Sequence, residues 1–542
     1  MKSKQRLVWF LGSTVFLCAV LGGIYGRRVE ATTQGDSTGV NSSLKKFTRV
    51  YDVIQQDYAS PVKPDEAIFG PTYGSSGSMT VGAIPAMLRT LDPHSNFFNP
   101  KDFAKLEEDQ QGKYFGVGMT IMTRLNQASH LITIVVQPMP DSPAQRAGLR
   151  PGDIITKVDN KPAEGLNVVQ VAALLKGQRG TQVHVTVDRE SVPKPMQFTI
   201  TRAEITAPSV DQAFMIQPHV GYIHISKFDE RTNSGLTAAL GKFRAEGMKA
   251  LILDLRDNPG GLLQEAVEVS DHFLERHQLI VYHYGRNSEE RRYFAVRGGR
   301  GNPYPMVVLI NGFTASAAEI VTGALQDHDR ALVVGQPSFG KGLVQTVYPL
   351  ADHAGLALTT ARYYTPSGRL IQRDYSNVSL WDYYNHPENV KIPHTQVRLT
   401  DGGREVYGGD GITPDIEVNT KLNPFQTQLW TRDVFFNFAR AYAANHPGIP
   451  QDFQSSGAVT QEFKRYLAAQ KLEFTDKDFQ DNLEFIQQHI REQVIGVVYG
   501  EGQAKKLELE DDPAVEKALE NMPQAAQLLV NVKRYIASRS KN

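Results

Sequence analysis

Short apolar runs alternate with helical stretches between about residues 204 and 422, and this alternation constrains the fold more than any other feature of the sequence. Strands are expected at 219–225, 249–255, 278–284, 305–311 and 330–335, and helices at 236–247, 261–274 and 316–327. Such a pattern is typical of strands and helices packed in layers. It predicts a layered α/β core at 204–422.

A β-rich module precedes this core, at about 105–203. Its hydrophobic period is two, with strands at 130–136 and 182–188 and one helix near 167–177. A chain of 542 residues is too long for one hydrophobic core, so several domains are expected. The module is therefore predicted to fold as a compact unit of its own.

Helical patterns occupy both flanks. The segment 44–104 contains apolar residues at helical spacing over 44–58, and a second helix is expected to end at Asp92. The region 423–542 reads as amphipathic helix with few strand signals. The sequence thus predicts a multidomain α/β protein with an N-terminal helical segment and a C-terminal helical region.

The extreme N-terminus has the pattern of an export signal or a membrane anchor. Lys2, Lys4 and Arg6 precede an uncharged apolar run at 7–26, which is long enough to span a bilayer. The residues "VEA" at 29–31 could serve as a signal cleavage site, although basic residues beside such a site are unusual, and the length of the apolar run favours a retained anchor. We expect a cell-envelope or periplasmic protein, held at the inner membrane by 7–26 or exported after cleavage.

Composition excludes little else. Residues 1–31 are assigned to the signal or anchor, and 32–43 is a polar linker with too few apolar residues to fold. The only cysteine, Cys18, lies in the apolar run, which excludes disulfides and cysteine-based metal sites from the exported part. Lys plus Arg and Asp plus Glu both number 58, so charge gives no argument for a nucleic-acid partner.

A glycine-bracketed lysine follows the strand expected at 330–335. Gly335, Gly340 and Lys341 have the spacing of a phosphate-binding loop, but Gly342 supplies no hydroxyl for magnesium, and the next residues alternate like a strand. Lys341 is then either an exposed turn lysine or, if burial lowers its pKa, a general base. Gln345, four residues on in that strand-like run, faces the same side and could orient the amine.

Ser316 follows the strand expected at 305–311 and opens a helix. A strand-to-helix turn can expose a nucleophile beside free backbone N–H groups. Ser316 and Glu319 also have the spacing of a capping box, in which the serine only satisfies helix N–H groups. No histidine has a recognisable catalytic setting, so these residues alone leave both interpretations open.

The β-rich module resembles a PDZ domain in "YFGVGMTI" and "SPAQRAGLRPGDIITKVD". By that resemblance, the loop of Gly116, Val117, Gly118 and Met119 would receive the terminal carboxylate of a peptide, and the strand after it would pair with the peptide. The alternative is that Gly116 and Gly118 only form a tight turn.

The chain from about 44 to 418 resembles the carboxyl-terminal processing proteases, which are Ser-Lys peptidases with an embedded PDZ domain. The matching pieces are "LDPHS", "GYIHISKF", "LILDLRDNPGGLL", "TASAAEIVTGALQDHDRALVVGQPSFGKGLVQ", "ARYYTPSGRLIQ" and "GITPDIEV". The resemblance implies that Ser316 is the nucleophile, Lys341 the general base and Gln345 its orienting neighbour. It further implies an oxyanion hole made by the N–H groups of Ala317 and of Gly260 or Gly261, with no metal and no cofactor.

Two features depart from the family pattern. Ala318 stands where the family commonly has serine, at a helix position expected to face outward, and an insertion at 373–410 is expected to lie on the surface. The implied function is a serine endopeptidase that engages the C-terminal ends of protein substrates. The alternative is a catalytically silent PDZ adaptor or chaperone. Self-association into a homo-oligomer is compatible with the sequence, which does not determine the number of copies.

Overall fold

The structure is a computed structural model. It describes residues 37–57, 64–69, 82–125, 130–190, 192–298, 304–376, 378–385, 396–419 and 421–539. The chain divides into two compact units, Met1–Pro71 and Thr72–Asn542. The predicted anchor at 7–26 lies outside the described residues. Among the helices that are described, none is both long enough and apolar enough for a membrane span.

The first unit contains helices α2 (Ser37–Asp57) and α3 (Pro64–Phe69). The helix expected at 44–58 is present, but it begins at Ser37, so the later half of the predicted linker is helical. Once an apolar-periodic segment has nucleated a helix, each preceding residue extends it at little cost, and this explains the earlier start.

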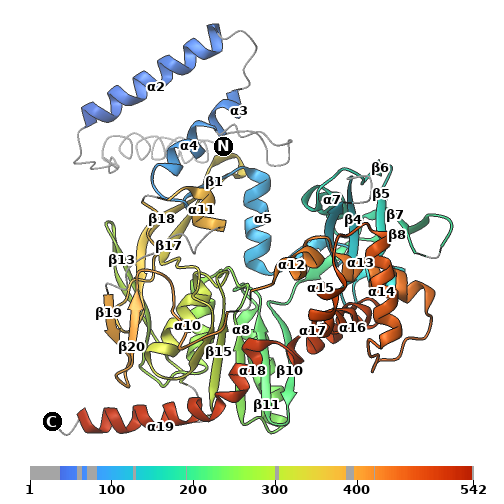
Figure 1. Cartoon of the computed structure of the whole chain (residues 1–542). Coiled ribbons are helices and arrows are strands. Elements are labelled where there is room, and N and C mark those ends of the chain that lie inside the picture. Colours follow the sequence, from blue (N-terminus) through green and yellow to red (C-terminus); the bar gives the residue numbers. More distant parts are fainter. Residues whose placement is uncertain are drawn as a thin grey trace, which may run out of the picture. The chain divides into compact units, whose positions relative to one another are not determined.

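A six-stranded sheet forms the centre of the second unit (Figure 1). Its strands, in spatial order, are β10 (Val210–Gln217), β11 (Val220–Ile225), β12 (Ala250–Asp254), β15 (Met306–Ile310), β16 (Leu332–Gly335) and β21 (Ile416–Glu417). β10 and β11 are antiparallel, and every other neighbouring pair is parallel. The predicted layered α/β core is confirmed.

Both faces of this sheet are covered, as parallel strands require. One face packs against α8 (Thr232–Ala245), α9 (Leu263–Asp271) and α10 (Ala317–Asp327). The opposite face packs against α18 (Pro513–Glu520) and α19 (Met522–Arg539), at the end of the chain (Figure 1). The C-terminal helices therefore complete the hydrophobic core of the α/β domain.

A second sheet lies beyond α10. It contains β1 (Asn96–Phe98), β18 (Gly355–Tyr364), β13 (Leu279–Gly285) and β14 (Ser288–Phe294), with β17 (Leu343–Pro349) paired to β18. Helix α10 contacts β13 of this sheet and β16 of the first, and all its residues are buried. Ala318 is fully buried in the core, so the expectation that it faces outward was wrong. A helix between two sheets has no outward face.

The β-rich module is a sheet in the order β3 (Met119–Leu125), β4 (Leu131–Pro138), β5 (Ile154–Val158), β7 (Gln182–Asp188) and β8 (Met196–Thr201), with β6 (Lys161–Pro162) on β5 and helices α6 (Pro143–Ala147) and α7 (Val168–Leu175). A separate ribbon of β2 (Lys113–Gly116) and β9 (Ala203–Thr206) joins the module to the rest of the chain. The β-rich module was expected to begin at about residue 105, but residues 105–111 belong to helix α5 (Pro100–Gln111).

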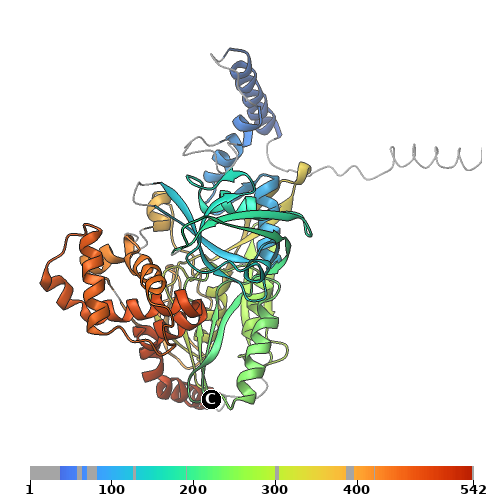
Figure 2. The same cartoon turned by 90° about the vertical axis from the view of Figure 1, so that its right-hand side faces the viewer.

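The remaining elements are mostly helical. Before β1 lies α4 (Ala83–Arg89), which ends before Asp92 because the residue preceding a proline disfavours helix. The insertion contains α11 (Leu380–Asn385), β19 (Gln396–Leu399) and β20 (Glu405–Gly408). Then follow α12 (Pro424–Thr431), α13 (Val434–Asn445), α14 (Gly457–Ala469), α15 (Asp476–Asp481), α16 (Leu483–Tyr499) and α17 (Glu501–Glu510). Helices α12 to α16 share a hydrophobic core of their own and lie beside the β-rich module (Figure 2).

Candidate active site

Ser316 lies at the strained turn between β15 and α10. Its backbone has φ 55° and ψ −114°, a conformation that costs a residue with a Cβ about 1–3 kcal/mol. Two hydrogen bonds hold the turn: the Ala315 N–H donates to the Asn258 carbonyl at 2.8 Å, and the Ser316 N–H donates to the Glu319 carboxylate at 2.7 Å. Ser316 and Glu319 thus form the capping pair that their spacing suggested, but with Ser316 in a backbone conformation that an ordinary helix cap does not need.

The Glu319 carboxylate connects this turn to the lysine loop. One oxygen accepts from Ser316 N–H at 2.7 Å and from Lys341 N–H at 2.9 Å. The other accepts from the Ser338 hydroxyl at 2.5 Å and from Gly340 N–H at 2.7 Å. Burial raises the pKa of Glu319, and these four donors oppose the rise. The loop that resembles a phosphate site in sequence therefore directs its N–H groups at a buried carboxylate.

Lys341 is half-buried, so the exposed-turn interpretation was wrong. Its Nζ donates to Gln345 Oε1 at 3.0 Å, and Gln345 Nε2 donates in turn to the His94 carbonyl. Burial lowers the pKa of Lys341, against the raising effects of Glu319 and Asp92. In this arrangement the Lys341 amine can lose its proton at a pH below the ordinary lysine pKa.

A cavity of about 720 Å³ opens beside Lys341. Its lining is largely apolar and aromatic: His94, Asn96, Asp257, Pro259, Phe313, Ala315, Phe339, Lys341, Gln345 and Tyr384. Tyr384 comes from α11 and stacks on Phe339 with ring centroids 6.0 Å apart. The insertion at 373–410 was expected to lie on the surface, and α11 does so only in part: Tyr384 is exposed at the cavity wall, whereas Tyr383 is fully buried.

The two glycines proposed for the oxyanion hole differ in their contacts. A Cβ on Gly260 would lie 2.7 Å from Ser316 Cβ and 2.9 Å from Ala317 N, so only glycine allows this approach. The Gly260 N–H already donates to Asn258 Oδ1 at 2.8 Å. Gly261 pairs with Phe228 through its neighbours, and its own N–H has no acceptor among the described residues. Ala317 opens α10, so its N–H has no partner within the helix.

Comparison with known proteins assigns the family. A carboxy-terminal-processing protease of Bartonella bacilliformis is 34% identical over 371 residues, which cover 68% of this chain and 80% of that protein. The chain belongs to the carboxy-terminal-processing protease family. A carboxyl-terminal-processing protease of Synechocystis sp. is 37% identical over 298 residues, covering 54% of this chain and 69% of that protein.

The family models agree with this assignment. Peptidase family S41 matches residues 219–379, a PDZ domain matches 134–189, and a probable PDZ-protease C-terminal helical domain matches 425–477. The solved photosystem II D1 C-terminal processing protease is 29% identical, covering 64% of this chain and 83% of that one, with a TM-score of 0.35. The sequence matches alone carry the assignment: this carboxy-terminal-processing protease is a serine peptidase with a PDZ domain.

The PDZ loop of this family member is shaped by its carbonyl groups. The Val117 carbonyl accepts from Ala144 N–H at 2.8 Å, and the Gly118 carbonyl accepts from Met139 N–H at 3.0 Å. Gly118 has φ 76°, and a Cβ there would lie 2.6 Å from Ser142 Cβ. Gly116 ends β2 in the joining ribbon, and Met119 begins β3, the edge strand of the PDZ sheet. The carbonyl groups of Val117 and Gly118 are thus hydrogen-bonded within the domain. On one side of β3, no described strand pairs with it.

Sequence reasoning missed the residues that surround Lys341 from the "LDPHS" segment. Asp92 Oδ1 accepts from the N–H groups of His94 and Ser95, both at 2.7 Å. Burial and then the Lys341 charge lower the pKa of His94 to about 4, against the effect of Asp92, and its Nε2 lies 2.9 Å from the Tyr383 hydroxyl. The sequence identified this segment only as a match to the family, because no local sequence pattern predicts that His94 lies beside Gln345.

Tyr363 is a further contact that was not predicted. Its buried hydroxyl lies 3.0 Å from the Ser316 carbonyl and also contacts the Lys341 carbonyl. A tyrosine in β18 thus bridges the two segments that carry the candidate dyad. For a metal the described residues offer no cluster of three or more His, Cys, Asp or Glu side chains.

Proposed function

We propose that this serine peptidase is an endopeptidase that cleaves peptide bonds with Ser316 as nucleophile and Lys341 as general base. The observation that supports it most is the half-buried Lys341, whose amine donates to Gln345 in a cavity whose wall also includes Ala315, the residue before Ser316. Glu319 holds both segments in one network. A silent adaptor would need neither a lysine whose pKa is lowered by burial nor a strained serine turn.

The chemistry follows from these groups. The neutral amine of Lys341 takes the proton of the Ser316 hydroxyl as the oxygen attacks a peptide carbonyl. The N–H groups of Ala317 and Gly261 stabilise the oxyanion, since the Gly260 N–H is bonded to Asn258. Lys341 returns the proton to the leaving amine, and water then releases the acyl group from Ser316.

We further propose that the PDZ domain selects substrates by their C-terminal ends. The loop of Val117 and Gly118 would receive the carboxylate, and the open edge of β3 would pair with the peptide as an added strand. The basic residues and apolar run at the N-terminus support a location in the cell envelope, with 7–26 as membrane anchor.

Hydrolysis of denatured casein by the purified chain tests the dyad. Ser316→Ala and Lys341→Ala should each abolish cleavage, because the two side chains act in one chemical step. Ser234→Ala is the matched control, since this exposed hydroxyl only bonds the carbonyl of Arg231. Cleavage by Ser316→Ala at the rate of Ser234→Ala would refute the nucleophile assignment.

Substrate ends test the PDZ role without altering the protein. A chain with a free apolar C-terminus should be cleaved faster than the same chain with an amidated terminus. If the domain also gates the reaction, a short C-terminal peptide added in trans should accelerate cleavage of a second substrate that lacks a usable end. Equal rates for free and amidated ends would contradict C-terminal recognition, and competition at every peptide concentration would contradict gating.

A further inference from the structure

The end of the C-terminal region reaches the loop that lies against Ser316. The three family matches stop at residue 477, whereas α18 and α19 follow at Pro513–Arg539. Asp512 caps α18: its Oδ1 accepts from Ala514 N–H at 2.8 Å and from Val515 N–H at 3.2 Å. Its Oδ2 accepts instead from Arg256 at 2.6 Å. One carboxylate thus joins a C-terminal helix to the segment after β12.

Arg256 is held from two sides. Its guanidinium also binds Asp254, with Nη2 2.6 Å from Oδ2, and both side chains are largely buried. Burial alone would raise the pKa of Asp254, yet the Arg256 charge lowers it to about 2. The Arg256 carbonyl lies 3.2 Å from His224 Nε2. The position of this arginine is therefore set by β12 on one side and by Asp512 on the other.

Arg256 begins the loop 256–261, which ends at Gly260 and Gly261. A Cβ on Gly260 would lie 2.7 Å from Ser316 Cβ, and Asn258 within the same loop accepts from Ala315 N–H at 2.8 Å. A displacement at the start of this loop would move Asn258 and Gly260, which contact the turn of Ser316, and with them Gly261 of the proposed oxyanion hole. Catalytic geometry is sensitive to shifts of about 1 Å.

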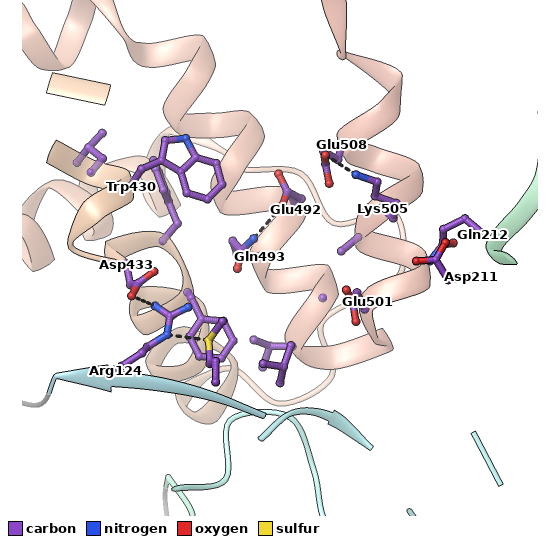
Figure 3. Close-up of a pocket in the computed structure, with 18 of the residues that line it drawn as sticks. Arg124, Asp211, Gln212, Trp430, Asp433, Glu492, Gln493, Glu501, Lys505 and Glu508 are labelled. Atoms are coloured by element: carbon purple, nitrogen blue, oxygen red, sulfur yellow. Dashed lines mark hydrogen bonds and ion pairs between the residues drawn. The ribbon is translucent and has the colours of Figure 1, made fainter. Parts of the chain in front are cut away.

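Helix α18, which Asp512 caps, packs as part of the α/β domain. Ala514, Val515 and Ala518 are buried against the central sheet. Toward the PDZ domain, a cavity of about 440 Å³ is lined by β3, α13, α16 and α17, and on one side of it Arg124 of β3 forms an ion pair at 2.5 Å with Asp433 at the start of α13 (Figure 3). Asp512 is thus fixed to the sheet that carries the loop.

We infer that Asp512 is a positioning residue for the peptidase reaction: from α18 it holds Arg256, and through Arg256 the loop 256–261 beside Ser316. The inference rests on the proposed function, because that loop supplies the proposed Gly261 donor. The C-terminal helices would then influence kcat as well as complete the hydrophobic core of the α/β domain.

Two substitutions in the full chain separate this role from helix capping. Asn and Ser cap helices about as well as Asp, so Asp512→Asn and Asp512→Ser keep the cap. Asn would place an NH2 group against the guanidinium, and Ser is too short to reach it. Glu510→Gln is the matched control, since it removes the same charge from an exposed side chain whose ion-pair partner among the described residues is Arg491, at 3.4 Å.

The readouts are kcat and KM on a short fluorogenic peptide, together with the melting temperature. Both Asp512 variants should lower kcat about 10- to 100-fold, with KM and melting temperature close to those of Glu510→Gln. A kcat equal to that of Glu510→Gln would overturn the inference, as would a loss of kcat no greater than the loss of folded protein. Activity in Ser316→Ala, measured alongside, would overturn the proposed function and this inference with it.

Discussion

Glu319→Gln should weaken both the fold and the reaction, because the Glu319 carboxylate accepts four hydrogen bonds in a fully buried position. One oxygen binds the N–H groups of Ser316 and Lys341, and the other binds Ser338 and Gly340. If the new NH2 group faces Ser316 and Lys341, two buried N–H donors lose their acceptor. If it faces the other side, Gly340 N–H loses its acceptor, whereas the Ser338 hydroxyl can rotate and accept from the NH2 group.

An unsatisfied buried donor costs about 1–3 kcal/mol, so even the better amide orientation should destabilise the protein by about 1–3 kcal/mol. At about 2–4 °C per kcal/mol for a unit of about 200 residues, the melting temperature of the α/β domain should fall by at least about 2 °C. The rate should also fall, by about 100-fold at a temperature where the variant is fully folded, because either amide orientation disturbs the network that joins the Ser316 turn to the loop of Gly340 and Lys341.

The assay is thermal unfolding together with casein hydrolysis at 25 °C, with Glu265→Gln as control. Glu265 is also largely buried, but its carboxylate accepts one backbone bond, from Asn233 N–H at 2.8 Å. Its substitution should therefore cost less in stability and leave the rate near that of the parent protein. If Glu319→Gln matches Glu265→Gln in both melting temperature and rate, the reasoning about the Glu319 network is wrong.

Three further predictions concern the dyad. The rate should rise with pH as Lys341 loses its proton, and the rise should occur below the ordinary lysine value of 10.5 because burial lowers the pKa of Lys341; a rate that falls over this range in a stable protein would contradict a lysine base. Gln345→Leu removes the acceptor 3.0 Å from Lys341 Nζ and should lower kcat about 10-fold, the effect of one hydrogen bond, whereas Gln264→Leu on the exposed face of α9 should not. EDTA should leave casein hydrolysis unchanged, because the proposed dyad needs no metal; loss of activity that zinc restores would be incompatible with it.

Local patterns in the sequence were enough for much of the fold. The apolar runs at 219–225, 249–255, 305–311 and 330–335 became β11, β12, β15 and β16, and the helix expected at 316–327 became α10. The PDZ domain and the serine peptidase family were recognised from contiguous motifs, and the comparisons confirm both. These features depend on residues close together in the chain, so their periodicity and spacing are visible without a structure.

The surroundings of the candidate dyad depend on contacts that no local pattern contains. Gln345 meets the carbonyl of His94, and Arg256 meets Asp512, across hundreds of residues of chain. The apolar run at 278–284 gave no sign that β13 would join the second sheet instead of the first. Nor did Ala318 reveal that both sides of α10 would be covered.

The sequence by itself therefore determined which segments are strands and helices, and where a serine and a lysine stand at their ends. Only the tertiary structure decided that Glu319 would hold both of those ends and that α18 would close the far face of the sheet. The physical reason is that backbone propensity and hydrophobic period act over a few residues. The pairing of apolar faces and the satisfaction of buried polar groups are instead settled by whichever distant segments pack together.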